Sequence, residues 1–272
     1  MKAQNKVIVV TGGGSGMGRE LVLHLLAKGA KVVTIDINES TLQETVKLAG
    51  SNAVNLSMFV IDITDRSAVE GLLEKVISKF GFVDGIINNA GIIQPFIKVN
   101  DLSYEAIERV MNINFYGTLY LIKTFLPHLL TRPEAHIVDI SSMGGFLPVP
   151  GQTIYGASKA AVKLLTEGLH SELANTNVKV TVVFPGGVRT NIMSNSGLAD
   201  RMGSSSAKGA QSILSADKAA TMIIDGMEQN RYRVLVGKDA KMMDLLYRLN
   251  PAYAAGLIAK KMSSLLSAKA NH

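Results

Sequence analysis

The chain has 272 residues, of which 47% are hydrophobic and 18% charged, as is typical of a compact globular protein rather than a disordered one. It has no cysteine, which excludes disulfides and cysteine-ligated metals, and no apolar run approaches the ~20 residues of a membrane span, so we expect a cytoplasmic protein. The net charge of +6 arises from Arg231 onward, where eight Lys or Arg face two Asp. No basic stripe with interleaved aromatic residues runs through the fold, so no nucleic-acid partner is expected.

A glycine-rich loop follows the first predicted strand. Residues 6–10 are a short β-branched run, typical of a buried strand, and residues 19–28 carry apolar side chains at helical spacing. Glycines in such a loop let the backbone approach a pyrophosphate, and the helix N-terminus offers free N–H groups to it. The order of strand, glycine-rich loop and helix predicts a dinucleotide site, with a plain glycine-rich turn as the alternative. The loop residues that would hold the cofactor are Gly12, Ser15, Gly16, Met17 and Gly18.

The second predicted strand ends in Asp36. A carboxylate there can accept hydrogen bonds from the adenosine ribose, and it repels a 2′-phosphate. Ile37 follows, and Ser15 lies in the loop, so neither position supplies a cation for that phosphate. We therefore expect NAD as the cofactor, with NADP less favoured. Asp36 could instead cap the next helix, but Asn38 and Ser40 are better placed for that.

Helical and strand patterns alternate through the rest of the chain. Strands are expected at 55–61, 83–88, 135–141 and 178–184, and helices at 39–48, 65–80, 104–130 and 153–175. This alternation predicts an α/β fold, a Rossmann-type doubly wound parallel sheet of about seven strands with helices on both faces. In such a sheet the residues just past the strand ends gather on one edge.

Tyr155 and Lys159 lie four residues apart on the helix predicted at 153–175, and so on the same helical face. An ammonium beside a phenol lowers the pKa of the phenol, which lets the tyrosine exchange a proton near neutral pH. Taken alone the pattern is weak, because a half-buried tyrosine beside a solvated lysine is common.

Several ordered motifs together resemble the short-chain dehydrogenase/reductase family over residues 6–236. They are Thr11-Gly12-x-x-x-Gly16-x-Gly18, Asn88-Asn89-Ala90-Gly91, Asn114, Ser142, Tyr155-x-x-x-Lys159 and Pro185-Gly186. The resemblance implies a catalytic tetrad of Asn114, Ser142, Tyr155 and Lys159, and hydride transfer between carbon and a nicotinamide ring. Ser142 would hold the substrate oxygen, Tyr155 would exchange its proton, and Lys159 would lower the pKa of Tyr155. The Asn114 carbonyl would bind a relay water at a bend in its helix.

The same resemblance assigns further cofactor contacts. Asp62 and Ile63 would flank the adenine, Asn89 with Ala90 and Gly91 would meet a ribose, and the nicotinamide amide would lie against Pro185, Gly186, Val188 and Thr190. Other interpretations stay open for single residues. Ser142 could be a turn residue, Asn114 a polar core group and Thr190 a helix cap.

The substrate end is predicted by position only. Residues 191–216 resemble the mobile substrate lid of this family. The expected substrate-binding residues are Gln94, Ser142, Met143, Phe146, Val149, Gln152 and Met193. Most of them are apolar, which favours a neutral, rather hydrophobic secondary alcohol or ketone.

Residues 1–237 are expected to form the dehydrogenase domain, and residues 238–272 a basic amphipathic extension of two helices broken at Pro251. The extension could pack over the substrate mouth or a neighbouring subunit, touch an anionic membrane, or form a poorly ordered tail. The resemblance suggests a homo-oligomer, a dimer or a tetramer, built on the helices at 104–130 and 153–175.

We therefore expect an NAD-dependent alcohol dehydrogenase or carbonyl reductase that needs no metal. The alternative within the family is a 3-oxoacyl-thioester reductase. The alternative from another class is a non-catalytic NAD-binding scaffold or redox sensor.

Overall fold

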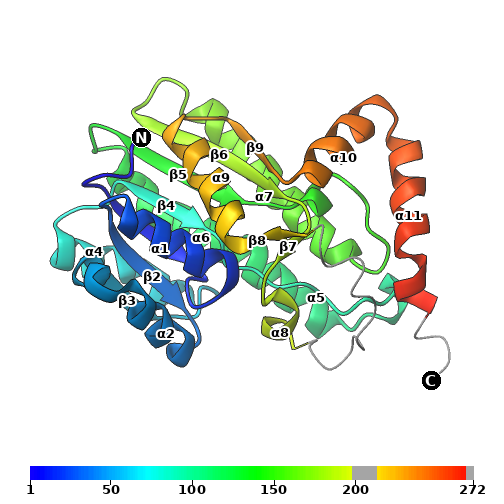
Figure 1. Cartoon of the computed structure of the whole chain (residues 1–272), viewed down its shortest axis with the longest axis horizontal. Coiled ribbons are helices and arrows are strands. Elements are labelled where there is room, and N and C mark those ends of the chain that lie inside the picture. Colours follow the sequence, from blue (N-terminus) through cyan, green and yellow to red (C-terminus); the bar gives the residue numbers. More distant parts are fainter. Residues whose placement is uncertain (198–212, 268–272) are drawn as a thin grey trace.

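A parallel sheet forms the centre of the molecule. The computed structural model describes residues 1–197 and 213–267, with side chains up to residue 262. Seven parallel strands lie in the order β3 (Leu56–Val60), β2 (Lys31–Asp36), β1 (Val7–Thr11), β4 (Gly85–Asn88), β5 (Ala135–Ile140), β6 (Val178–Pro185) and β9 (Arg233–Val236) (Figure 1). The predicted doubly wound α/β sheet is confirmed. The strand order reverses direction between β1 and β4, which opens a crevice at the carboxyl ends of these strands.

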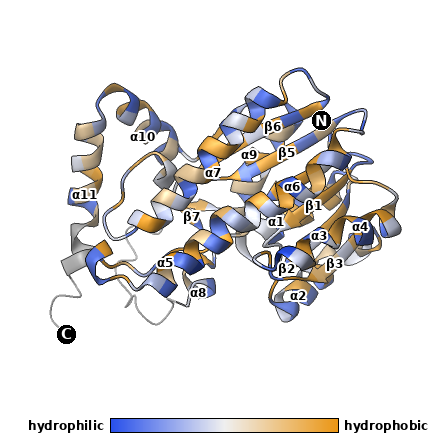
Figure 2. Ribbon diagram, turned by 180° about the vertical axis from the view of Figure 1, so that it is seen from behind, coloured by the Kyte–Doolittle hydropathy of each residue, from blue (hydrophilic) through white to orange (hydrophobic). Residues whose placement is uncertain are grey.

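The central strands are apolar on both faces because helices cover both. Every residue of β1 is buried, and Val9 pairs with Val33 of β2 and with Ile86 of β4. One core lies between the sheet and α1 (Gly16–Ala27), α2 (Glu39–Ala49) and α9 (Ala216–Glu228). The second core lies on the other face, under the helices in between (Figure 2). These are α3 (Arg66–Glu70), α4 (Leu72–Phe80), α6 (Gly117–Leu129) and α7 (Thr153–Glu172), and α5 (Tyr104–Met111) packs against α7.

Two predicted helices differ in detail from the structure. The helix expected at 65–80 is divided into α3 and α4 at Gly71, whose N–H closes the last turn of α3. The helix expected at 104–130 is continuous in path but contains a π-helical turn, Asn112–Tyr116. Such a turn inserts one extra residue and shifts the hydrogen-bond register, so it is the local irregularity expected at Asn114.

The C-terminal helices pack at one end of the molecule (Figure 1). They are α10 (Lys238–Leu249) and α11 (Pro251–Ser267), and Pro251 opens α11, where its missing N–H costs nothing. Met243, Ala254 and Ile258 form a small buried cluster with Leu147, which follows the fifth strand of the sheet. None of the helices in the described ranges is both long enough and apolar enough to cross a membrane.

The predicted lid, 191–216, is described only at its two ends. These are α8 (Ile192–Asn195) and the short strand β8 (Leu214–Ser215), which pairs with β7 (Val188–Arg189). Residues 198–212 lie outside the described residues.

Candidate active site

A cavity of about 770 Å³ opens at the carboxyl edge of the sheet, where β1 and β4 diverge. Its size is that of a site for a cofactor and a small ligand. Every residue predicted to bind the cofactor lines it: Gly12, Ser15, Gly16, Met17, Gly18, Asp36, Ile37, Asp62, Ile63, Asn89, Ala90, Gly91, Tyr155, Lys159, Pro185, Gly186, Val188 and Thr190. The fold therefore brings together residues that are scattered over most of the sequence.

The backbone conformation and the close packing of the glycine loop both require glycine. Gly12 and Gly16 have positive φ values of 70° and 51°, which side chains with a Cβ rarely adopt. A Cβ at Gly18 would collide with the carbonyl oxygen of Gly12 and lie 2.6 Å from Asn89 Nδ2. The first turn of α1 thus packs directly on the loop, with its N-terminus toward the cavity. This is the geometry that a pyrophosphate requires.

Asp36 ends β2 at the cavity wall. Its carboxylate accepts hydrogen bonds from the N–H groups of Gly14 at 3.0 Å and Asn38 at 3.2 Å. Asn38, not Asp36, caps α2, because the Asn38 side chain accepts from Thr41 N. The nearby Arg19 guanidinium is directed to α2, where it pairs with Glu44 at 2.6 Å and donates to the Gly14 carbonyl. The carboxylate of Asp36, rather than a cation, therefore stands at the end of β2.

Ser142 and Tyr155 meet at the cavity. A hydrogen bond from Ser142 favours the phenolate of Tyr155, but burial outweighs it and raises the pKa of the phenol above its ordinary value. The hydroxyl of Ser142 also accepts from Gly144 N at 3.0 Å, which fixes its position. Ser141 serves a different purpose, because its hydroxyl donates to the Lys159 carbonyl at 2.7 Å.

Lys159 lies buried behind Tyr155. Its ammonium donates to the Ile140 carbonyl at 2.9 Å, and burial lowers its pKa to about 8. The expected lowering of the Tyr155 pKa by this ammonium does not appear in the structure, because burial governs the phenol and Ser142 supplies the opposing hydrogen bond.

A buried carboxylate that sequence reasoning missed acts on Lys159. Asp139 lies on β5 and is fully buried, and burial raises its pKa to about 6. It accepts hydrogen bonds from Asn88 Nδ2 at 2.7 Å and Thr166 Oγ1 at 2.9 Å. Its charge raises the pKa of Lys159, against the larger effect of burial. The one available signal was an acidic residue within a strand that, apart from Asp139 and His136, is apolar.

Asn114 lies at the π-helical turn and is fully buried. Its side chain accepts from Ile92 N at 2.9 Å and donates to Ser158 Oγ at 2.9 Å, so it connects the loop after β4 to α7. A Cβ built on Gly91 would lie 3.1 Å from both Asn114 Oδ1 and Lys159 Nζ. Asn114 is thus next to the lysine but behind the cavity wall. Its backbone carbonyl accepts from Thr118 Oγ1 at 2.9 Å.

The loop after β4 is held by Thr11. Asn89 donates from its side chain to the Thr11 carbonyl at 3.0 Å, and the Thr11 hydroxyl accepts from the N–H groups of Asn89 and Ala90. These bonds join β1 and β4 at the point where the strands diverge.

The helix α8, at the start of the predicted lid, covers one side of the cavity. Asn191, Ile192 and Asn195 line the cavity, and Asn195 Nδ2 donates to Ser15 Oγ at 2.9 Å. Thr190 lies against the glycine loop, 3.1 Å from where a Cβ on Gly16 would be. Its hydroxyl also accepts weakly from Ile192 N at 3.4 Å, as a helix cap would.

Of the predicted substrate residues, Ser142 lines this cavity. Gln94 and Gln152 are buried, and Gln94 Oε1 accepts from the first N–H groups of α7, those of Ile154 at 2.7 Å and Tyr155 at 2.9 Å. Gln94 thus positions the start of the catalytic helix.

The remaining predicted substrate residues lie elsewhere. Met143, Phe146 and Val149 pack against the C-terminal helices, with Phe146 beside Tyr247 at a ring distance of 6.2 Å. Met193 is half-buried on α8. Of the alternatives stated for the C-terminal extension, packing on the same chain beside the loop after Ser142 is the one found in the structure.

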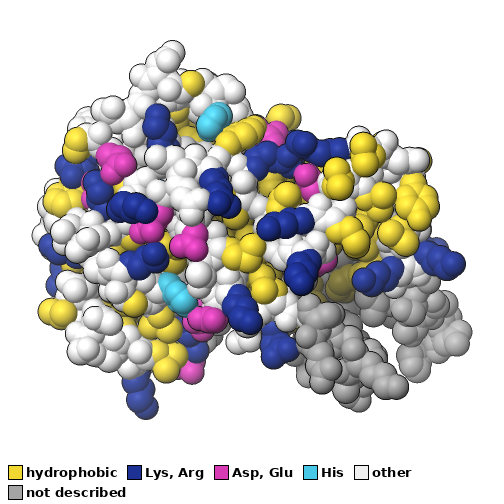
Figure 3. Space-filling view, turned by 45° about the horizontal axis from the view of Figure 1, so that its top comes forward, with side chains coloured by type: hydrophobic (Ala, Val, Ile, Leu, Met, Phe, Trp, Pro, Cys, Tyr) yellow, Lys and Arg dark blue, Asp and Glu magenta, His cyan; other side chains and the backbone are white. Residues whose placement is uncertain are grey.

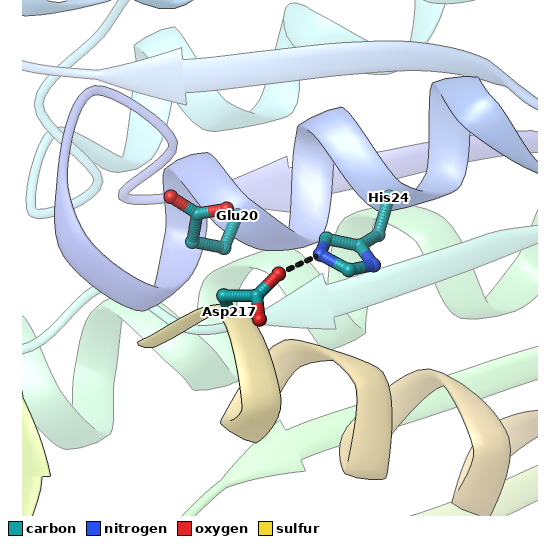
Figure 4. Close-up of side chains that lie close together, drawn as sticks. All are labelled: Glu20, His24 and Asp217. Carbon is teal, nitrogen blue, oxygen red and sulfur yellow. Dashed lines mark hydrogen bonds and ion pairs between the residues drawn. The ribbon is translucent and has the colours of Figure 1, made fainter. Parts of the chain in front are cut away.

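A separate cluster of possible metal ligands lies away from the cavity (Figure 4). Glu20 and His24 come from α1 and Asp217 from the start of α9, and their ligand atoms lie within 4.8 Å of one another. His24 Nε2 hydrogen-bonds Asp217 Oδ1 at 2.8 Å, and Asp217 is exposed. The cluster is accounted for as a polar contact between two packed helices.

Comparison with known proteins agrees with this geometry. Residues 6–200 match the family model described as short chain dehydrogenase. The chain is 37% identical over 264 residues to the oxidoreductase SadH of Mycobacterium tuberculosis, covering 94% of this chain and 95% of that protein. It is 34% identical over 190 residues to the 3-oxoacyl-acyl-carrier-protein reductase FabG of Thermotoga maritima, covering 70% and 77%.

A solved structure is similar along most of the fold. The short-chain dehydrogenase/reductase of Burkholderia phymatum in complex with NAD superimposes with a TM-score of 0.77 at 28% identity, covering 86% of this chain and 90% of that one. The chain described here belongs to the short-chain dehydrogenase/reductase family.

Proposed function

We propose that this protein is an oxidoreductase that transfers a hydride between NAD(H) and a neutral, rather hydrophobic secondary alcohol or ketone. The observation that carries the proposal is the placement of Ser142 and Tyr155 at the cavity, with Lys159 buried directly behind them. A non-catalytic scaffold would not need these three groups in contact with one cavity.

The residues suit general acid–base catalysis. When bound, the reduced nicotinamide supplies the hydride that reaches the carbonyl carbon. Ser142 donates a hydrogen bond to the carbonyl oxygen and orients it, and the phenol of Tyr155 gives its proton to that oxygen as negative charge develops. Lys159 then stabilises the resulting phenolate. In the oxidising direction each proton movement is reversed.

The cofactor assignment rests on Asp36. Its carboxylate faces the place where a ribose would lie, and Arg19 is already engaged by Glu44. Among the described residues that line the cavity, the basic side chains are Lys159, at the catalytic end, and Arg109, on α5. This arrangement favours NAD over NADP, and the NAD complex of the Burkholderia relative is consistent with it.

The substrate class rests on the apolar wall beside the catalytic pair. Ile92, Ile93 and Ile192 contribute to it, and they favour a neutral substrate over a free acid. A second candidate is a 3-oxoacyl thioester, because the Thermotoga relative is named as a reductase of such substrates.

We also propose a homo-oligomer, a dimer or a tetramer, built through α5, α6 and α7. Large apolar side chains stand exposed on two of these helices, Tyr104 at 80% on α5 and Leu164 at 68% on α7. A partner subunit that covered them would remove apolar surface from water.

The function is tested by Tyr155→Phe in an assay of NADH oxidation with a panel of ketones. We expect turnover to fall by about 10²–10⁴-fold, because the ring stays in place while the proton donor is lost. NADH binding, followed by cofactor fluorescence, should change little. Tyr104→Phe, at an exposed tyrosine on α5, is the matched control and should keep full activity. Turnover that survives Tyr155→Phe would refute the proposed mechanism.

A further inference from the structure

The outward side of the C-terminal helices combines apolar and basic side chains. On α10 the exposed positions recur three or four residues apart, and so share one face. We call this surface, with its continuation on α11, the C-terminal face (Figure 3). Its members are Lys238, Lys241, Met242, Leu245, Arg248 and Leu249 on α10, and Tyr253, Leu257, Lys260 and Lys261 on α11.

The apolar members are unusually exposed. Leu249 is 75% exposed, Leu245 61%, Tyr253 60% and Met242 59%. The opposite side of both helices is already buried, through Met243, in the small cluster against Leu147. The C-terminal face is therefore not needed to attach the helices to the rest of the molecule.

The acidic residues of α10 point away from this face. Asp239 accepts from Gly187 N at 2.7 Å, and Asp244 is buried and pairs with Arg233 at 3.1 Å. Arg248 also reaches Asp244, at 3.5 Å. The sequence has no Asp or Glu after Asp244. The exposed charged side chains of the face are therefore all cations, of which Arg248 is paired with the buried Asp244.

The combination of exposed apolar side chains and cations favours one kind of partner for the C-terminal face over the others. A helix face in contact with water is ordinarily polar and carries charges of both signs. A second copy docking symmetrically would bring two cationic surfaces together, which opposes association. Apolar side chains surrounded by cations match a helix lying at the surface of an anionic bilayer, where each Lys or Arg is attracted by the lipid headgroups.

We infer that the C-terminal face docks on membranes that carry anionic phospholipids. The helices lie on the surface and do not cross it. The inference rests on the exposure and charge of α10 and α11 and is independent of the substrate proposed above.

The test is sedimentation of the full chain with lipid vesicles. One vesicle preparation is phosphatidylcholine alone, and the other contains about a third phosphatidylglycerol. We expect the protein to sediment with the anionic vesicles only, and the bound fraction to fall as salt is raised, because salt screens the cations. Equal binding to both preparations, or binding to neither, would overturn the inference.

Two double variants locate the surface. Leu245→Ser with Leu249→Ser removes apolar contact, and Lys238→Glu with Lys241→Glu reverses charge. Each should weaken partition onto anionic vesicles at least about tenfold. The matched controls lie at exposed positions far from the face. They are Leu48→Ser with Val54→Ser, and Lys75→Glu with Lys79→Glu, and both should bind as the parent does.

Two further measurements separate the alternatives. Far-ultraviolet circular dichroism and NADH binding should match the parent for all variants, because every substituted side chain is exposed. Molar mass by light scattering should also be unchanged. If the leucine variant dissociates an oligomer while vesicle binding persists, the face belongs to a second copy and the membrane inference is wrong.

Discussion

Asp139 is a carboxylate kept inside the core beside an ammonium. Burial raises its pKa from an ordinary value of 3.8 to about 6 and lowers that of Lys159 from 10.5 to about 8. Between pH 3.8 and 6 the folded state holds the Asp139 proton that the unfolded state has lost, so stability falls as pH rises through that window. Between pH 8 and 10.5 the folded state has lost the Lys159 proton, so stability rises with pH. Both charged groups thus cost stability at neutral pH, as groups kept for chemistry often do.

We predict that Asp139→Asn shifts the alkaline limb of the kcat/KM profile to lower pH by about one unit. The carboxylate supports the charge on Lys159, so its loss lets the ammonium deprotonate earlier. The profile of kcat/KM reports groups of the free enzyme, which is the state described here. Asp84→Asn is the control. That carboxylate is also buried but pairs with Arg132 at 3.0 Å, so its loss should lower stability without moving the limb. An unmoved limb in Asp139→Asn would contradict this account.

We predict that Asp36→Asn changes cofactor preference. The amide keeps the shape of the side chain but removes the charge that repels a 2′-phosphate. The Kd for NADH should rise about tenfold and that for NADPH should fall. Both are measured by fluorescence titration. Glu39→Gln is the control. It removes an equal charge from an exposed side chain three residues after Asp36 and should leave the ratio of the NADH and NADPH Kd values unchanged. Tighter NADPH than NADH binding by the parent protein would remove the basis of the NAD assignment.

At the scale of elements, two local irregularities contribute to the candidate active site. They are the loop between β1 and α1 and the π-helical turn at Asn114. The loop lets α1 approach the cavity closely because Gly18 rests on the Gly12 carbonyl. The π-helical turn brings the Asn114 side chain to Ile92 and Ser158. Both irregularities lie beside the cavity at the carboxyl edge of the sheet.

A pair of Gly→Ala substitutions tests the tight packing of that loop. Gly18→Ala should destabilise the protein by about 1–3 kcal/mol and weaken NADH binding, because the backbone of Gly12 must move. Gly168→Ala, on α7, meets no atom within 4 Å and should stabilise by about 0.5–1 kcal/mol, since alanine is the better helix former. Both values come from urea denaturation. Equal changes in the free energy of unfolding at the two positions would show that the close contact between residue 18 and the Gly12 carbonyl does not matter for stability.

At the scale of the whole molecule, what could be predicted from the sequence was local. The buried pattern of β1, the glycine loop and Asp36 can each be recognised from a few neighbouring residues. The parallel order of the sheet follows from the alternation of strands and helices along the chain. Gln94 and Asp139 could not be assigned in this way. Gln94 acts on a helix that begins some sixty residues later, and Asp139 acts on Lys159 only because β5 and α7 are packed together.

The residues predicted to bind the substrate show the same limit, because local sequence patterns do not reveal distant packing partners. Met143 and Phe146 were assigned to the substrate by their place after Ser142, which stays a prediction, and in the structure they also contact helices about a hundred residues further along the chain. No periodicity within residues 143–152 carries information about that partner. The lid predicted at 191–216 remains a prediction, since most of it falls outside the described residues.

The small cluster that attaches the C-terminal helices has a consequence for how such a protein changes over evolutionary time. Among the described residues, those that line the cavity all lie before Gly237, whereas α10 and α11 contact the loop after Ser142 through apolar side chains such as Leu147 and Met243, and Asp239 of α10 accepts a hydrogen bond from Gly187 N. Substitutions at the exposed positions of α10 and α11 can therefore accumulate without disturbing the chemical step. Lineages that share one inherited reaction can in this way diverge in where the enzyme resides and in what it meets there.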